Sequence, residues 1–341
     1  MGKTKIAVFG CGFWANYQIP GWLELDDVQI SAVYNRTKAK AEAIAEKFNI
    51  DGVYDDPEEL LKNEDVDVAD IITDVDTHLK FTEMAAIRGL DVVCQKPMAP
   101  DYREAKKLVQ VCRDNHVKLF VNENFRWQAP IRAAKKALDS GIIGDLFKAR
   151  ITFCSGFPVF DNQPFLADLE QFILTDIGSH ILDICRFLAG EVKILHCMIK
   201  RVNPKIKGED VANCLMEMEN GVHCYAEMSY ASILEKEVFP QTLLLLEGSK
   251  GSIHLDAGFE LKVTTRDGTT STIVKPVLYD WLDPEYAVVH SSIVDAQRDI
   301  LQGLRGGNAE TTGEDNFKTV QLVWASYESA KKSQIIALDT F

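Results

Sequence analysis

Apolar positions in the first third of the chain form short continuous runs, and a stretch with helical spacing follows most of them. The apolar runs occupy residues 5–9, 28–34, 68–73, 91–94 and 118–121. Helical spacing is found at residues 37–48, 78–88 and 102–115. Continuous apolar strands that alternate with helices are typical of a parallel sheet covered on both faces. The pattern therefore predicts a doubly wound α/β domain.

After residue 125 the runs become longer and alternate between apolar and polar positions. They occupy residues 147–154, 192–201, 212–219, 221–230, 242–247, 252–255, 261–265 and 270–274. Turn signals such as Asn220-Gly221 and Asp267-Gly268 separate several of them. Helices are expected at residues 131–140, 176–188, 289–304 and 316–333. This half therefore predicts a mainly antiparallel sheet covered by helices, an α+β domain.

The chain shows no internal repeat and no proline- or serine-rich linker, so the domain boundary is expected in a short crossover. At 341 residues the length favours two domains. We expect a dinucleotide-binding domain at residues 1–125. A domain for substrate binding and oligomerisation is expected at residues 126–341.

The charge balance narrows the range of partners. Lys and Arg total 37 against 51 Asp and Glu, which gives a net charge of −14. Nucleic acids and anionic membranes attract basic surfaces, so neither is expected to bind. The sequence begins without an apolar leader, and its eight cysteines are scattered with no C-x-x-C pair. These features favour a cytoplasmic protein with reduced thiols.

A glycine-rich turn follows the first predicted strand. It reads Gly10-Cys11-Gly12-Phe13-Trp14-Ala15 and matches G-x-G-x-x-A. Gly10 permits the tight turn, Gly12 lets the backbone approach a pyrophosphate, and Ala15 allows close helix packing. With Phe13 and Trp14, the turn predicts a Rossmann site for NAD or NADP. The alternative is a tight turn that binds no ligand.

The end of the second strand reports on the choice of dinucleotide. An acidic residue there would accept from the ribose hydroxyls of NAD, but the chain has Asn35 and Arg36. Asn35 can bond a hydroxyl, and Arg36 can stack on adenine or pair with a 2′-phosphate. NAD is expected and NADP is chemically permitted. A solvated helix start is the alternative for Arg36.

Ligands of open parallel sheets bind beyond the carboxyl ends of the strands. Thr73 and His78 follow the third predicted strand, and Gln95 and Lys96 follow the fourth. These four residues are therefore expected at the cofactor. Lys96 can also donate to a substrate oxygen, whereas the alternative is a lysine on a surface loop.

Asp176 and His180 lie four residues apart in a predicted helix and share a face with Asp183. A carboxylate beside an imidazole orients the ring and raises its basicity, which suits a general base. A histidine packed between helices and a metal site built with Asp183 are alternatives. No further ligand cluster accompanies these residues, so no metal is expected.

Taken together, the glycine turn, Lys96-Pro97 and the Asp176/His180 pair resemble the Gfo/Idh/MocA oxidoreductase family. The turn at residues 248–252 and the helix start at 313–316 are similar to family features as well. The resemblance implies that Lys96 is the catalytic lysine, Asp176 its acidic partner and His180 the base. It also implies a cis bond before Pro97 and places His78 near the cofactor. Gln95 departs from the family, which usually has glutamate there.

Two segments are expected to select the substrate. Residues 122–128 supply Asn124, Arg126 and Trp127, and residues 157–165 supply Phe157. Aromatic faces with amide donors suit a sugar or polyol, although ordinary packing is the alternative for the aromatic residues. The resemblance implies an NAD(P)-dependent dehydrogenase acting on a CH–OH group, with a branched pentose oxidised at its anomeric carbon as the specific case.

Two other functional classes share this fold. A non-catalytic NAD(P)-sensing regulator would lack Lys96, Asp176 or His180, and all three are present. An NAD-dependent glycosidase would retain its cofactor and produce no net NADH. A homo-oligomer, dimer or tetramer, is expected through the C-terminal sheet.

Overall fold

The computed structural model describes residues 2–341, with Asn162 described by its backbone alone. The chain divides into two compact units. The first runs to Asn124 and resumes at Leu278–Val320, and the second contains Phe125–Val277 and Gln321–Phe341. This division differs from a single cut at residue 125, because residues 278–320 return to the first unit.

Helix α9 (Ala287–Leu304) explains the return, since it packs against α1 (Ala15–Leu23). Gln297 Nε2 donates to the backbone oxygen of Gln18 at 2.9 Å. Gly21 makes room for this contact, because a Cβ there would lie 2.4 Å from Gln297 Oε1. Contacts between positions so distant in sequence leave no local pattern that could predict them.

Within the described residues, the first unit holds a six-stranded parallel sheet in the order β3-β2-β1-β4-β5-β6. Its strands are β1 (Thr4–Phe9), β2 (Val28–Tyr34), β3 (Gly52–Tyr54), β4 (Val68–Ile71), β5 (Asp91–Gln95) and β6 (Leu119–Asn122). The predicted doubly wound fold is confirmed, and the strand order reverses between β1 and β4. The three-residue edge strand β3 is too short to show a periodicity and was not expected.

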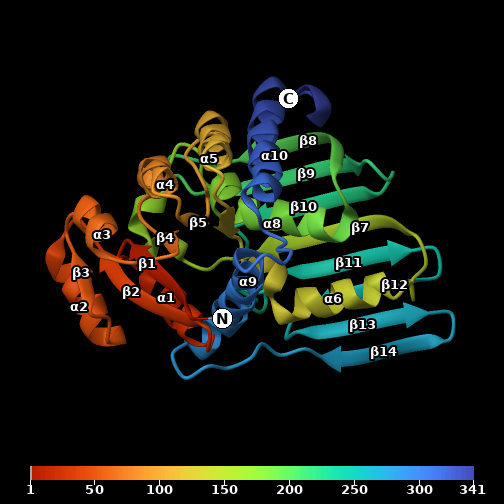
Figure 1. Ribbon diagram of the computed structural model, residues 1–341. Helices are drawn as coiled ribbons and strands as arrows, with labels where there is room; N and C mark the ends of the chain where they lie inside the picture. The colour runs from red at the N-terminus through yellow and green to blue at the C-terminus, as the bar shows by residue number, and fades with distance from the viewer. Residues whose placement is uncertain (1) are drawn as a thin grey trace. The chain divides into compact units, whose positions relative to one another are not determined.

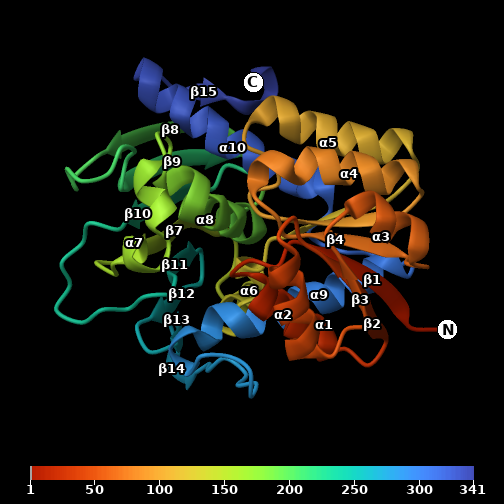
Figure 2. The same cartoon turned by 90° about the vertical axis from the view of Figure 1, so that its left-hand side faces the viewer.

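The remaining helices of this unit are α2 (Lys38–Phe48), α3 (Pro57–Asn63), α4 (His78–Ile87) and α5 (Tyr102–Asp114). Figures 1 and 2 show α4 beside α5, in agreement with their contacts. Residues such as Ile6, Val8 and Val33 are fully buried in the core. The switch in strand order places the ends of β1 and β4 side by side, where a dinucleotide binds in this fold.

In the part of the chain that the structure describes, the second unit holds a nine-stranded sheet in the order β14-β13-β12-β11-β7-β10-β9-β8-β15. Its strands are β7 (Leu146–Cys154), β8 (Val192–Lys200), β9 (Val211–Met218), β10 (His223–Ser229), β11 (Leu243–Gly248), β12 (Gly251–Asp256), β13 (Glu260–Thr265), β14 (Gly268–Ile273) and β15 (Ile336–Ala337). Neighbouring strands are antiparallel except for β7 and β10. The predicted, mainly antiparallel sheet is confirmed.

Helices cover one face of this sheet (Figure 1). Helix α6 (Ala129–Asp139) packs on β12 and β13, and α8 (Ile173–Ala189) packs on β7 and β10. The short helix α7 spans Val159–Asn162, and α10 (Gly313–Lys332) ends in this unit. Along β9, Cys214 and Met216 are buried while Leu215 is 48% exposed. No helix in residues 2–341 is long and apolar enough to cross a bilayer.

Candidate functional site

The glycine turn joins β1 to α1 and leaves room for a ligand. Gly10 has φ 111°, and a Cβ there would lie 2.8 Å from the backbone oxygen of Ile72, so only glycine fits. At Gly12 an added Cβ would meet no heavy atom within 4 Å. Helix α1 starts at Ala15 with no side-chain cap from Trp14. An open glycine before a helix N-terminus fits the pyrophosphate of a dinucleotide.

Asn35 supports this turn from the end of β2. Its Oδ1 accepts from the Cys11 amide at 3.2 Å, and its Nδ2 donates to the Thr37 oxygen at 3.1 Å. Arg36 Nη2 lies 3.4 Å from Asp74 Oδ2, with both side chains about four-fifths exposed. Asp74 therefore partly neutralises the cation that could otherwise receive a 2′-phosphate.

Gln95 is the last residue of β5, where it pairs with β6, and Lys96 follows it. Gln95 is buried, and its Oε1 accepts from the Lys96 amide at 2.7 Å. A single amide oxygen is enough for this contact, so glutamine can serve where the family usually has glutamate. The Lys96–Pro97 bond is cis, which confirms the expectation from the resemblance.

His78 joins two loops at the carboxyl edge of the sheet. Its Nδ1 lies 3.3 Å from the Met98 oxygen and its Nε2 lies 3.1 Å from the Thr73 oxygen. Burial lowers the pKa of this imidazole, so the neutral form is favoured. Thr73 Oγ1 also accepts from Thr77 at 2.7 Å. The neutral ring has one N–H and donates to one of these two backbone oxygens, and its position between them suits a role in packing the loops that carry Thr73 and Lys96.

Helix α8 carries Asp176 and His180 one turn apart. The Tyr230 hydroxyl donates to Asp176 Oδ2 at 3.3 Å. Burial and the neighbouring Asp176 raise the pKa of Tyr230, which therefore keeps its proton. His180 is 4% exposed and stacks on Phe125 with ring centroids 3.7 Å apart and planes 6° apart. Tyr230 was not expected at the site, because it is one of many apolar or aromatic residues in an alternating strand.

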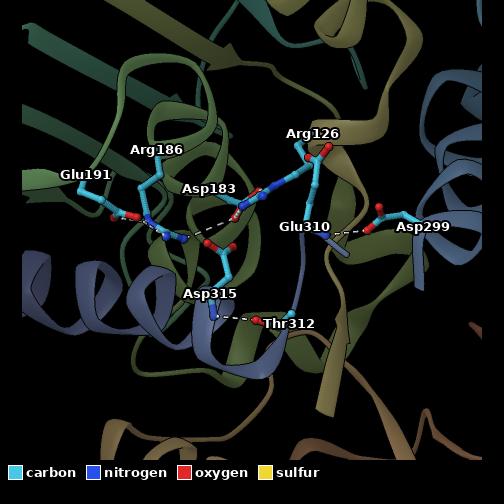
Figure 3. Close-up of polar contacts among 8 residues, drawn as sticks. All are labelled: Arg126, Asp183, Arg186, Glu191, Asp299, Glu310, Thr312 and Asp315. Atoms are coloured by element: carbon cyan, nitrogen blue, oxygen red, sulfur yellow. Dashed lines mark hydrogen bonds and ion pairs between the residues drawn. The ribbon is translucent and has the colours of Figure 1, made fainter. Parts of the chain in front are cut away.

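Arg126 pairs with a buried carboxylate. Its Nε and Nη2 donate to Asp183 at 2.7 and 2.6 Å, and both side chains are buried (Figure 3). Nearby, Arg186 makes two 2.9 Å hydrogen bonds to Glu191. The pair with Arg126 occupies Asp183, and contact of Arg126 with substrate stays a prediction. Among the described residues, no cluster of three or more His, Cys, Asp and Glu side chains could hold a metal ion.

Figure 3 also shows hydrogen bonds that hold the segment leading into α10, within the first unit. The Glu310 amide donates to Asp299 at 2.7 Å, and the Asp315 amide donates to Thr312 Oγ1 at 3.2 Å. Thr312 thus satisfies an amide in the first turn of the helix.

The other residues predicted to contact substrate all have internal partners. Asn124 Nδ2 donates to the Val289 oxygen at 3.0 Å and to Ser292 at 2.7 Å. The Trp127 ring lies 4.1 Å from the Arg132 guanidinium carbon. Phe157 stacks on Phe239 with centroids 4.0 Å apart. These contacts fit the alternative of packing, so direct contact of these residues with substrate stays a prediction.

Two family profiles match the chain. The one described as "Oxidoreductase family, NAD-binding Rossmann fold" matches residues 4–123, and the GFO/IDH/MocA C-terminal domain matches residues 131–254. A D-apiose dehydrogenase of Rhizobium rhizogenes is 40% identical over 98% of both chains. A D-apiose dehydrogenase of Paraburkholderia graminis is 39% identical over 98% of this chain and 90% of its own.

A solved structure extends the similarity. It is an oxidoreductase from Agrobacterium radiobacter in complex with NAD+, L-tartaric acid and magnesium. The two chains are 40% identical, with a TM-score of 0.97 and 99% of each covered. The sequence similarity, the fold and the open glycine turn all indicate an NAD-binding oxidoreductase. The chain therefore belongs to the Gfo/Idh/MocA family of NAD-binding oxidoreductases.

Proposed function

We propose that the protein is an NAD-dependent dehydrogenase that oxidises D-apiose at its anomeric carbon to a lactone. The observation that carries the proposal is the full-length similarity to D-apiose dehydrogenases in a chain whose Gly12 position is open. Lys96, Asp176 and His180 supply the side-chain chemistry that the reaction needs.

The proposed reaction breaks one C–H and one O–H bond of the sugar and forms a carbonyl. NAD, when bound, supplies the hydride acceptor. His180 removes the hydroxyl proton, and Lys96 donates a hydrogen bond to the oxygen that becomes the carbonyl. Asp176 supports these groups as a carboxylate whose Oδ2 is held by Tyr230. The stacked Phe125 ring fixes the plane of the His180 imidazole.

Preference for NAD over NADP is part of the proposal. Asp74 lies beside Arg36, so a 2′-phosphate there would meet a carboxylate as well as a guanidinium. Repulsion between the Asp74 carboxylate and the 2′-phosphate would weaken the binding of NADP. An Asp74→Asn variant is therefore expected to bind NADP more tightly, with little change for NAD.

We also propose that the open face of the second sheet binds another copy of the chain. Neighbouring positions of five strands form a mixed row of apolar and polar side chains on this face: Leu245, Arg150, Tyr225, Leu215 and His196. Leu215 is 48% exposed. Light scattering of Leu215→Arg tests the proposal, because loss of the oligomer is expected and an unchanged mass would contradict it.

A cytoplasmic location remains a proposal, and the thiols support it. All eight cysteines are free and seven are buried. Burial raises the pKa of Cys11 and Cys112 to about 12, so these thiols resist ionisation and oxidation.

Absorbance of NADH during incubation with NAD and a panel of aldoses and polyols tests the function. NADH should form with D-apiose faster than with other sugars. If no NADH forms with any of the sugars, the proposal is contradicted. Cleavage of a glycoside with NAD retained on the protein would indicate an NAD-dependent glycosidase. Binding of NAD without turnover of any substrate would indicate a regulator.

Two variants test the assigned roles. Lys96→Met and His180→Ala should each reduce turnover by about 10²–10⁴, because each removes a group that handles the proton. The Kd for NAD should stay close to that of the wild type. A loss of NAD binding instead would show that these residues have structural roles.

A further inference from the structure

Helix α8 begins without a side-chain cap of its own. Its N-cap residue is Phe172, which makes no capping hydrogen bond. The first amides of a helix lack partners within the helix, and a buried start needs acceptors from elsewhere. The acceptors here come from a segment more than thirty residues later in the sequence.

Glu209 supplies them. Its Oε2 accepts from the Phe172 amide at 3.3 Å, and its Oε1 accepts from the Leu174 amide at 3.2 Å. The backbone oxygen of Glu209 accepts from the Ile173 amide at 3.2 Å. Glu209 is buried, and its carboxylate also interacts favourably with the positive end of the helix dipole. The start of α8 is therefore held by one residue from outside the helix.

Tyr327 of α10 fixes that carboxylate in turn. Its hydroxyl donates to Glu209 Oε1 at 2.7 Å, and both residues are buried. Burial, followed by the charge of Glu209, raises the pKa of Tyr327. The phenol therefore remains protonated and continues to donate throughout the working pH range.

The same segment also positions the residue that contacts Asp176. Asp210 follows Glu209, and its backbone oxygen accepts from the Tyr230 amide at 2.9 Å. Tyr230 then donates to Asp176 Oδ2. Asp176 itself lies in the first turn of α8, where its amide donates to the Phe172 oxygen at 2.9 Å. Residues 209–210 thus fix both the helix turn that carries Asp176 and the phenol that bonds it.

We propose that Glu209, held by Tyr327, is a positioning residue for the dehydrogenase reaction. It sets the place of Asp176 and His180 through the first turn of α8 and touches neither substrate nor cofactor. This role rests on the proposed function. Small displacements of reacting groups are costly, because a shift of about 1 Å can reduce a rate by about 10².

Glu209→Gln and Tyr327→Phe test the role. Glutamine keeps one acceptor but turns an N–H group toward the helix amides, whereas Tyr327→Phe removes one donor and is the milder change. A second glutamate–tyrosine pair provides matched controls, since Tyr54 donates to Glu64 Oε1 at 2.7 Å in the first unit. Glu64→Gln and Tyr54→Phe remove equivalent hydrogen bonds at a distance in sequence from α8.

The measurement is a single turnover of D-apiose by enzyme saturated with NAD. The rate constant for NADH formation should fall by about 10- to 100-fold in Glu209→Gln and by less in Tyr327→Phe. Its amplitude and the Kd for NAD should stay near the wild-type values, and both controls should keep the wild-type rate constant. A merely structural role would lower the amplitude or the Tm and leave the rate constant unchanged.

The outcomes separate the two proposals. Wild-type protein that forms no NADH with any sugar overturns the proposed function and the role of Glu209 with it. An active wild type with unchanged rate constants in both Glu209→Gln and Tyr327→Phe overturns the positioning role alone. If Glu209→Gln fails to fold, Tyr327→Phe decides the question.

Discussion

The hydroxyl of Tyr230, the residue that follows β10, donates to Asp176 Oδ2 in the first turn of α8 at 3.3 Å. This contact limits the rotation of the Asp176 carboxylate. Tyr230 also stacks on Phe172, the residue at the start of α8, with ring centroids 5.6 Å apart. The phenol is thus fixed against the same turn that it contacts.

Tyr230→Phe should therefore lower kcat while the fold persists. Loss of one hydrogen bond to a carboxylate costs about 1.5 kcal/mol, equivalent to about tenfold in rate. Steady-state kinetics with NAD and the sugar measure the effect, and Tyr54→Phe is the matched control. A kcat equal to that of the wild type would show that the hydrogen bond does not orient Asp176 for the reaction.

Substitution of the two glycines of the turn should affect different properties, NAD binding for Gly12 and stability for Gly10. Gly12→Ala places a methyl group where no protein atom lies within 4 Å, so the Tm should be nearly unchanged while the Kd for NAD rises. Gly10→Ala combines a positive φ with a contact to the Ile72 oxygen. It should lower the free energy of unfolding by about 1–3 kcal/mol or more.

Calorimetric titration with NAD and thermal unfolding separate these two effects. A Gly12→Ala protein that binds NAD as tightly as the wild type would show that the dinucleotide does not approach Gly12. A Gly10→Ala protein with the wild-type Tm would show that the turn does not require glycine at position 10.

The buried pair of Arg126 and Asp183 should be important for stability. Arg126→Met removes the bidentate partner of a fully buried carboxylate, which costs at most about 3–5 kcal/mol because Arg186 Nη1 remains 3.9 Å from Asp183 Oδ1. Denaturant unfolding measures the loss, and Arg126→Met/Asp183→Leu should recover part of it. The exposed pair of Arg113 and Glu314 is the control, because Arg113→Met should cost less than about 1 kcal/mol. Equal losses in the two single variants would contradict this assignment.

Asp70 should make stability depend on pH. It is fully buried in β4, with hydrogen bonds from Trp22 at 2.8 Å and Asn122 at 3.3 Å. Burial raises its pKa to about 7, whereas an unfolded Asp titrates near 3.9. Between these values the folded state binds more protons, so Asp70 makes the free energy of unfolding fall as pH rises from about 4 to about 7.

Asp70→Asn should remove this contribution. Its plot of unfolding free energy against pH should fall less steeply than that of the wild type between pH 5 and pH 7. Asp51→Asn, which alters an exposed residue, is the control and should keep the wild-type slope. An unchanged slope in Asp70→Asn would mean that Asp70 is ionised in the folded protein throughout this range.

The local patterns of the sequence were sufficient for much of the fold. The runs before Gly10 and Lys96 predicted β1 and β5, and the i, i+4 spacing predicted the helix of Asp176 and His180. Each of these signals is carried by neighbouring residues. A family resemblance supplied the cis bond before Pro97, which no local pattern of polarity could have predicted.

Contacts between distant residues were not predictable in this way. The pairing of Arg126 with Asp183 spans 57 positions, and the bond from Tyr230 to Asp176 spans 54. Before the fold is known, Arg126 looks like a cation near the substrate, and Glu209 looks like an ordinary acidic residue. Their roles depend on burial and on which donors face them, and both are properties of tertiary structure.

The central claim is that a hydride leaves the anomeric carbon of D-apiose for NAD. The most direct test is mass spectrometry of the reduced cofactor after incubation of the enzyme with NAD and D-apiose deuterated at that carbon. The account predicts NADH that carries one deuterium, formed together with the lactone. Unlabelled NADH, or label that remains in the sugar, would contradict it.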